Sequence, residues 1–462
     1  MNKLTPIATA LILALSAPAL ADQAEDIEML KEQVRELQKE AGGNNLKFDV
    51  DYRVTADNIE YKLADGSTAK NDALLSNRLQ LGMGYQYNQK LIFKGLLSYN
   101  KAFGDTAQHN QRNISRFADF DWVVNENLDG NELKVKEVYM LYLGDAFLGN
   151  EQIPWTFSLG RRPSTNGFLA NHREGFEEEK SPLAHSINVE FDGLSLNTKL
   201  DKVTGIDGMA LKLCAGRGLS NASSRFMSNG TDYAKDESKT DNIDMIGFIF
   251  TPYNDGQYDI KAQIYHANNM IGMDINDIMI NDDYSFKDFG NINNATLSME
   301  VNGIGEFIND FLDDTLVFAS VSASQTDPKN GRAMLGSMDK ETGYSYWVGA
   351  KIPGFLDNDS FGFEYNHGSK YWRSFTYGED TLVGSKIAAR GDAYEAYYNL
   401  PLIDKALYLQ LRYTYIDYDY TGSNGFFGSA SAPMTIDDAL ATGMMNPVRS
   451  AQDIRAMIRY VY

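Results

Sequence analysis

From residue 46 onward, hydrophobic and polar side chains alternate along many segments of about ten residues. Residues 46–54, 78–87 and 407–415 show this alternation most clearly. Successive side chains of a β-strand point to opposite faces, so each such segment has one apolar face and one polar face. A soluble β-sandwich alternates in the same way. The lengths of the segments and of their connections therefore have to decide between the two folds.

Two features favour a transmembrane β-barrel over a sandwich. A tilted strand needs about ten residues to cross a bilayer, and many of the alternating segments have that length. The connections between them are short turns that alternate with long polar stretches, and short turns on one rim with long loops on the other are typical of outer-membrane barrels. The short connections include 88–90, 254–256 and 401–405, and the long ones include 100–130, 268–291 and 421–450. We therefore predict an all-β fold, a transmembrane antiparallel β-barrel that occupies residues 46–462.

The number of alternating segments predicts about 16 strands, and 14 to 18 strands are compatible with the pattern. An even number is expected when both ends of the barrel lie in the periplasm. A barrel of this size has room for a lumen. The predicted strands begin near residues 46, 76, 91, 132, 155, 185, 209, 242, 258, 293, 315, 343, 360, 391, 406 and 451.

The last segment of the chain has an uninterrupted apolar face that ends on an aromatic residue. Its members are Ile454, Ala456, Ile458, Tyr460 and Tyr462. The pattern resembles the terminal strand signal by which bacterial outer-membrane proteins are recognised for insertion. We therefore expect the barrel-assembly machinery to be a partner, together with outer-membrane lipid and lipopolysaccharide.

The first 21 residues have the three parts of an export signal. Lys3 supplies the positive start, residues 4–20 form a short apolar stretch, and Ala19-Leu20-Ala21 gives the small-x-small pattern of a cleavage site. We expect residues 1–21 to be a signal peptide and the mature chain to begin at Asp22. A membrane anchor is the weaker alternative, because the apolar stretch is short and an acidic segment follows it directly.

Between the signal and the barrel, the apolar residues follow the spacing of a heptad repeat, with steps of three and four. The intervening residues are good helix formers, and the Gly and Asn residues at 42–45 end the helix. We predict that residues 22–45 form a periplasmic coiled-coil helix and its linker, which joins copies of the chain in a homo-oligomer, a trimer being one possibility. An amphipathic helix that lies on the barrel or on the cell wall is the alternative. The seam residues are Ile27, Leu30, Val34, Leu37 and Ala41.

Composition and charge exclude several classes of protein and of site. The 63 acidic residues outnumber the 42 basic ones, and the net charge of −21 argues against a nucleic-acid partner. A single cysteine, Cys214, excludes an internal disulfide and a four-cysteine zinc site. The five histidines are scattered, and none accompanies a GxSxG serine motif. We therefore expect no enzyme activity, no catalytic residues, no cofactor and no metal.

The polar faces of the predicted strands are expected to line a water-filled lumen. Because both signs of charge are present, the lumen would select only weakly between anions and cations. Arg161 and Arg162 are adjacent at a strand end, so only one of them can enter the lumen. They predict either a basic constriction or a loop anchor that pairs with Glu174 or Glu177. The candidate pore-lining residues are Lys134, Lys136, Arg161, Arg162 and Arg412, with Arg455 and Arg459, and the acidic Asp49, Asp51 and Glu190.

The segment Gly160–Gly167, together with a coil before a porin-length barrel, resembles an uncharacterised family of Gram-negative outer-membrane proteins known only as a domain of unknown function. The resemblance covers nearly the whole mature chain and implies a fold and a location but no substrate. We expect an outer-membrane channel for passive diffusion of small hydrophilic solutes or ions. The alternative is a structural or interaction protein. Its coil would tether the outer membrane to the cell wall, or its barrel would sheathe a periplasmic partner such as an electron-transfer protein.

Overall fold

The computed structural model describes most of the chain from residue 46 onward. Both the signal peptide and the coiled coil that the sequence predicts lie outside the described residues. Within the described part, no helix is long and apolar enough to span a membrane. The described residues are 46–104, 128, 132–162, 164–175, 179–222, 228–238, 240–305, 308–329, 331–356, 358–376, 381–404, 406–422 and 424–462.

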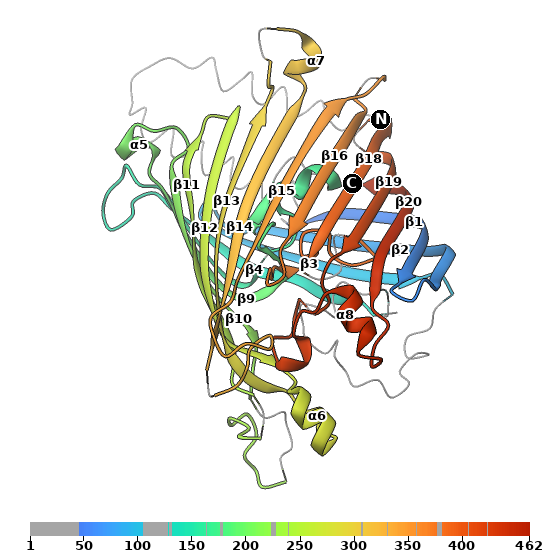
Figure 1. Ribbon diagram of the computed structural model, residues 1–462. Coiled ribbons are helices and arrows are strands. Elements are labelled where there is room, and N and C mark those ends of the chain that lie inside the picture. Colours follow the sequence, from blue (N-terminus) through green and yellow to red (C-terminus); the bar gives the residue numbers. More distant parts are fainter. Residues whose placement is uncertain are drawn as a thin grey trace, which may run out of the picture. The chain divides into compact units, whose positions relative to one another are not determined.

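Sixteen antiparallel strands form one closed barrel, as the sequence predicts (Figure 1). The first strand, β1, pairs with the last, β20, from Asp51 opposite Val461 to Leu63 opposite Val448. In order around the barrel the strands are β1 (Leu46–Leu63), β2 (Thr68–Gln86), β3 (Leu91–Ala102), β4 (Lys134–Gly144), β5 (Trp155–Arg162), β9 (Phe191–Lys199), β10 (Ala210–Leu219), β11 (Ile243–Asn254), β12 (Tyr258–Gly272), β13 (Lys287–Asn302), β14 (Leu316–Pro328), β15 (Thr342–Pro353), β16 (Ser360–Gly368), β18 (Gly391–Ile403), β19 (Leu407–Tyr418) and β20 (Val448–Val461).

The two rims of the barrel differ in the lengths of their connections. The rim where β1 begins and β20 ends carries tight turns, such as residues 87–90 and 255–257. It also carries the short helices α5 (Asp201–Thr204) and α7 (Asp310–Asp313). The other rim carries the long connections, with α6 (Ile275–Asn281) and α8 (Ile436–Ala441), and Figure 1 shows the two pairs of helices at opposite rims. We call the first the turn rim and the second the loop rim.

The outer wall of the barrel is apolar and the inner face is polar. Along β20 the side chains of Ile454 and Ile458 are 52% and 51% exposed, whereas those of Asp453 and Arg459, which point inward, are 1% and 4% exposed. Leu297, Val321 and Phe363 are exposed on other strands. So much apolar side-chain surface in regular rows requires lipid around the wall.

One predicted wall strand is wrong. The strand expected near residue 185 begins at Phe191 as β9, and the residues before it lie inside the barrel. Leu183, Ala184 and His185 are each at most 1% exposed, although a wall strand leaves every second side chain open to lipid. The other strands start within three residues of their predicted positions, except that β2 starts at residue 68 instead of 76 and β13 at residue 287 instead of 293.

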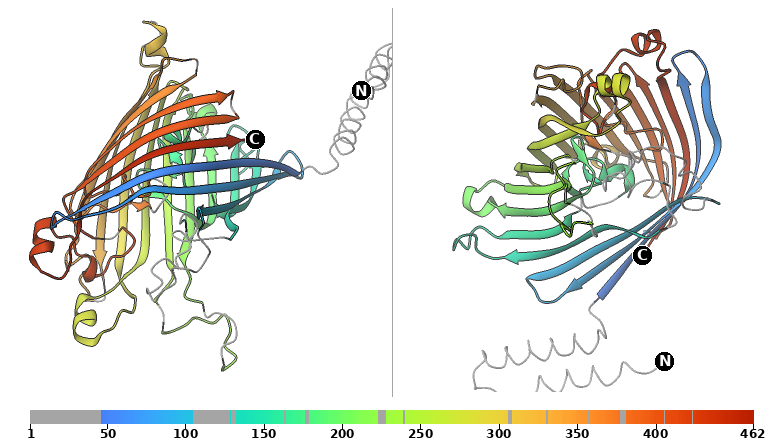
Figure 2. Two further views of the ribbon diagram at one scale, coloured as in Figure 1. Left: turned by 90° about the vertical axis from the view of Figure 1, so that its right-hand side faces the viewer. Right: turned by 90° about the horizontal axis from the view of Figure 1, so that it is seen from below.

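Two segments fold into the barrel from the loop rim. The first inner loop, residues 164–175 and 179–190, contains β6 (Gly167–Phe168), α4 (Asn171–Glu174), β7 (Lys180–Leu183) and β8 (Ile187–Asn188). The second inner loop, residues 369–376 and 381–390, contains β17 (Phe375–Thr376), which pairs with β8 in parallel. Seen along the barrel, the first inner loop lies within the ring of strands (Figure 2, right).

The apolar core lies between these loops and one side of the wall. Phe168 and Leu183 of the first inner loop pack with Phe318 and Trp347, which belong to β14 and β15. A second cluster joins Ile187 to Tyr265 and Phe427. The lumen is therefore partly filled by the chain itself.

The apolar wall generates a prediction. Val321 lies near the middle of β14 and is 54% exposed, so Val321→Arg places a charge in the bilayer core. We expect the free energy of unfolding to fall by about 2–4 kcal/mol. The matched control is Met338→Arg, which changes an exposed residue between β14 and β15. Guanidinium unfolding in lipid bilayers, followed by tryptophan fluorescence, gives both values, and equal midpoints would contradict a lipid-facing wall.

Candidate functional site

The candidate site is the lumen, where the first inner loop is fixed to the wall by polar contacts. The ring nitrogens of His185 lie 2.7 Å from Ser320 Oγ and 2.9 Å from Ser345 Oγ. The backbone N–H of Leu183 donates to Gln263 Oε1 at 3.0 Å. All of these side chains are buried, so each contact satisfies a group that water cannot reach.

An ionic cluster holds the end of α4 against the opposite side of the wall. The carboxylate of Glu174 pairs with Arg53 of β1. It also lies 3.1 Å from Arg173 Nε and 3.7 Å from Arg412 Nη1 of β19. Arg459 of β20 donates to the backbone oxygen of Glu174 at 2.5 Å. One inner-loop residue therefore meets three strands on both sides of the β1–β20 closure.

Asp51 organises the same cluster from the wall. Arg459 donates to both oxygens of its carboxylate, at 3.1 Å from Nε and 3.0 Å from Nη2. Arg53 Nε and Arg78 Nη2 approach the same carboxylate at 3.4 Å and 3.6 Å. Two-pronged pairing of this kind fixes orientation as well as charge, because the guanidinium group is planar.

The second inner loop is held by a buried lysine. Lys386 Nζ lies 2.5 Å from Glu364 Oε2 and 2.5 Å from Glu395 Oε1, on β16 and β18. Thr414 donates to Glu395 at 2.8 Å, and the Trp347 indole N–H donates to Glu364 at 3.0 Å. Removing one member of such a buried pair leaves the other uncompensated, which costs about 3–5 kcal/mol.

Several predicted pore-lining residues take part in these contacts. Asp51 and Arg412 belong to the ionic cluster, and Arg459 and Arg455 extend it along β20, where Arg455 Nε lies 2.5 Å from Asp57. Lys136 Nζ pairs with Glu190 Oε1 at 2.5 Å, and both side chains are fully buried. Lys136 is on β4 and Glu190 is the last residue of the first inner loop, so this pair also fixes that loop.

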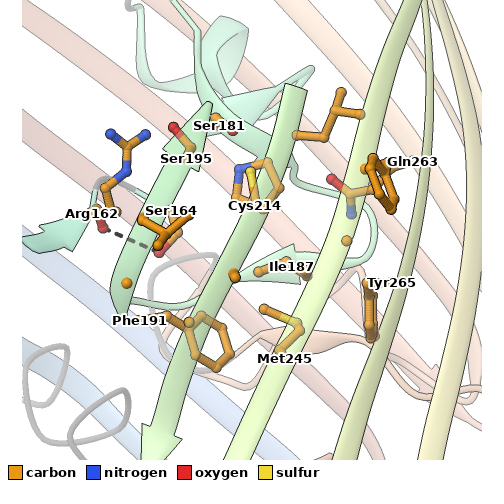
Figure 3. A pocket seen from close by; sticks show the side chains of 18 of the residues that line it. Arg162, Ser164, Ser181, Ile187, Phe191, Ser195, Cys214, Met245, Gln263 and Tyr265 are labelled. Atoms are coloured by element: carbon orange, nitrogen blue, oxygen red, sulfur yellow. Dashed lines mark hydrogen bonds between the residues drawn. The ribbon is translucent and has the colours of Figure 1, made fainter. Parts of the chain in front are cut away.

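The two adjacent arginines separate, as the strand geometry requires. Arg162 packs over the ring of Tyr139 at 5.2 Å and lines a cavity of about 70 Å³ together with Ser195 and Cys214 (Figure 3). Arg161 donates to the backbone oxygen of Lys136 at 3.0 Å.

Arg161 has one acidic partner among the described residues. Its Nη1 lies 3.5 Å from Asp192 of the neighbouring strand β9. Glu174, one of the two expected partners, instead pairs with Arg53, Arg173 and Arg412. Glu177, the other expected partner, lies outside the described residues. Arg161 of β5 therefore contacts both neighbouring strands, β4 and β9, whereas Arg162 faces a small cavity.

The remaining predicted residues lie at the edges of the site. Asp49 is exposed near the turn rim. Its side chain lies beside Gly82 of β2, where a built Cβ would be 3.1 Å from the Cβ of Asp49. Lys134 is half-buried at the start of β4. Ile454, Ala456, Ile458, Tyr460 and Tyr462 are exposed, and their role as an assembly signal stays a prediction. The coil residues Ile27, Leu30, Val34, Leu37 and Ala41 lie outside the described residues.

Sequence reasoning missed three of the residues that hold the inner loops, Arg53, Lys386 and Glu395, and it named Glu174 only as a partner of Arg161 or Arg162. Arg53 and Glu395 lie on the polar faces of alternating strands, and that alternation is a signal that would have found them. Glu174 and Lys386 lie in segments without periodicity, and nothing in the sequence marks them as buried. In the part of the chain that the structure describes, no group of three or more His, Cys, Asp or Glu side chains could hold a metal ion.

The comparisons with known proteins place this barrel in a family. Residues 68–462 match the model of a family described as "Protein of unknown function (DUF3373)". The chain belongs to this family. No curated protein sequence matches the chain. The family match confirms the resemblance that the sequence suggested, but it gives no activity.

Solved structures show the same fold at low sequence identity. The anion-selective porin from Comamonas acidovorans superimposes with a TM-score of 0.50 at 11% identity, over 90% of this chain and 100% of that one. OprB of Pseudomonas putida superimposes with a TM-score of 0.49 at 13% identity, over 93% of this chain and 96% of that one. The trimer form of in-vitro folded OmpT of Vibrio cholerae superimposes with a TM-score of 0.44 at 12% identity, over 91% of this chain and 100% of that one. The first of these comparisons shows that this DUF3373 chain is similar to a porin in fold.

The ionic cluster generates a prediction about the first inner loop. Glu174→Gln removes the charge that faces Arg53, Arg173 and Arg412, so the loop should detach from the wall while the barrel stays folded. We expect local destabilisation of about 3–5 kcal/mol. Limited trypsin digestion should then cut after Arg173 or Lys180 much faster than in the wild type.

The matched control for this prediction is Asp244→Asn. It removes one carboxylate from the exposed pair with Arg217, which is worth about 0–1 kcal/mol. The control should be cut at the wild-type rate. Equal cutting of the Glu174→Gln variant and the control would show that the cluster does not hold the loop.

Proposed function

We propose that this DUF3373 protein is an outer-membrane channel through which small hydrophilic solutes or ions diffuse passively. The observation that carries the proposal is the combination of an apolar outer wall with a charged inner face in one closed barrel. A lipid-facing wall stabilises the barrel in a membrane, and a polar interior favours water and charged solutes. The porin fold supports the same reading.

The inner loops define what kind of channel this would be. They occupy part of the lumen and are fixed by Glu174, Lys386 and the Lys136–Glu190 pair. A lumen narrowed in this way would admit small solutes and exclude large ones. The charges of these four residues are paired with opposite charges, which favours weak selectivity between anions and cations.

The same arrangement weighs against a sheath around a protein partner. The first and second inner loops take up space that an inserted protein chain would need. A tether to the cell wall depends on residues 22–45, which lie outside the described residues, and no observation favours it. Outer-membrane lipid, lipopolysaccharide, the barrel-assembly machinery and further copies of the chain, as in a trimer, stay proposed partners.

Single-channel recording in planar bilayers tests the proposed function. The wild type should give small, discrete, ohmic current steps. Glu174→Gln combined with Lys386→Gln should give larger steps, because both inner loops lose the charges that hold them to the wall.

The control combines Asp244→Asn with Arg217→Gln, an exposed ion pair outside the lumen, and should match the wild type. Folding is checked beforehand by heat-modifiable mobility on gels. A silent membrane with folded wild-type protein would rule out the channel.

A further inference from the structure

Two buried arginines lie side by side where the inner loops meet the loop rim. Arg373 follows Trp372 in the second inner loop, and Arg390 is the last residue of that loop before β18. They are 1% and 4% exposed. Neither belongs to the ionic cluster around Glu174 or to the Lys386 contacts.

Arg373 has donors without acceptors. Its Nη1 donates to the backbone oxygen of Trp372 at 2.6 Å, but Nε and Nη2 are buried and have no hydrogen-bond partner among the described residues. A guanidinium group carries five N–H donors, and three of them are on these two nitrogens. Buried polar groups in native structures are almost always satisfied, so these three point to a missing acceptor.

Arg390 has acceptors, but all of them are neutral. Its Nε donates to Thr421 O at 3.2 Å, its Nη1 to Asn424 Oδ1 at 2.7 Å, and its Nη2 to Gly422 O. No carboxylate in the described part of the chain lies within ion-pair distance of Arg373 or Arg390, whereas every other cluster in the lumen combines both signs. Among the described residues, the pair therefore has no counter-charge.

Gly422 lies beside both guanidinium groups. A Cβ built on Gly422 would lie 3.0 Å from Ser431 O, 3.2 Å from Arg373 Nη2 and 3.9 Å from Arg390 Nε. Arg390 and Gly422 also line a cavity of about 370 Å³, together with Ser385, Tyr420 and Asn424. A bound group that reaches the Cα of Gly422 from this cavity would meet both arginines.

The energetics favour an anion at this position. Two like charges removed from water are costly unless an opposite charge compensates them. Burial and the neighbouring Arg390 both lower the pKa of Arg373, and burial lowers the pKa of Arg390 to about 10. Arginine keeps its charge in proteins even so, and the repulsion is relieved only by an anion.

We infer that Arg373, Arg390 and Gly422 form a binding site for an oxyanion, the phosphate or carboxylate group of a small solute. The planar donor array of arginine fits two oxygens of either group. A free solute fits better than a lipid headgroup, because both guanidinium groups are buried inside the loops and away from the outer wall. A role of this site in collecting solutes for passage through the barrel rests on the proposed function.

The inference is tested with full-length protein in detergent, freed of lipopolysaccharide. Inorganic phosphate is titrated at constant ionic strength against chloride, and binding is followed by calorimetry. Arg373→Gln should weaken phosphate binding by about 10- to 100-fold, the loss of charge-assisted hydrogen bonds. Arg217→Gln, an exposed arginine paired with Asp244, should bind phosphate as the wild type does.

A second readout separates a binding role from a structural one. In chloride alone, Arg373→Gln should raise the temperature at which the folded band disappears on gels, because the variant removes an uncompensated buried charge. If Arg373 instead stabilised the fold, Arg373→Gln would lower this temperature. Phosphate should raise the midpoint of the wild type and not that of the variant.

Three outcomes overturn the inference. Equal phosphate binding in the wild type and in Arg373→Gln would show that the chain supplies its own counter-charge. A lower midpoint for the variant in chloride would show the same. Binding of purified lipopolysaccharide that requires Arg373, without binding of phosphate, would assign the site to a lipid headgroup. None of these measurements depends on conduction, so a silent bilayer and a failed titration remain distinguishable.

Discussion

Every backbone N–H and C=O group inside a bilayer needs a partner within the protein, and the pairing of β1 with β20 meets this requirement for the two strands that would otherwise be edges. All other features of the structure follow from that closure. It fixes one face of each strand toward lipid and the other toward the lumen, so the alternation of side chains becomes a division between two environments. The outward rows, such as Ile454 and Ile458, are apolar, and the inward rows carry the charge.

A closed ring of sixteen strands surrounds more space than its own side chains fill, and the inner loops occupy part of it. These loops are fixed by two different kinds of contact. On one side, Phe168 and Leu183 pack against Trp347. On the other, Glu174 and Lys386 are buried among opposite charges. Buried ion pairs contribute little net stability but hold groups in one arrangement, which suits loops that define a passage.

The wall could be predicted from the sequence because its rule is local. Two-residue periodicity places Asp51, Arg412 and Arg459 on inward faces without knowledge of any partner. The rule fails where both faces of a segment are buried, as around His185. Hydrophobic and polar side chains do not alternate along such a segment, so its sequence cannot be told from that of a loop. Partners across the lumen, such as Glu174 with Arg53, are 121 residues apart and follow only from the closed fold. That Arg373 has no carboxylate partner among the described residues is likewise invisible in the sequence.

The first inner loop is a fixed part of the barrel interior. Hydrogen–deuterium exchange measures this most directly, because the amides of residues 183–189 are buried there and those of residues 228–238 lie in a loop-rim connection. We expect residues 183–189 to exchange nearly as slowly as the wall strands and far more slowly than residues 228–238. Exchange of both segments at the same fast rate would show that the loop is not fixed.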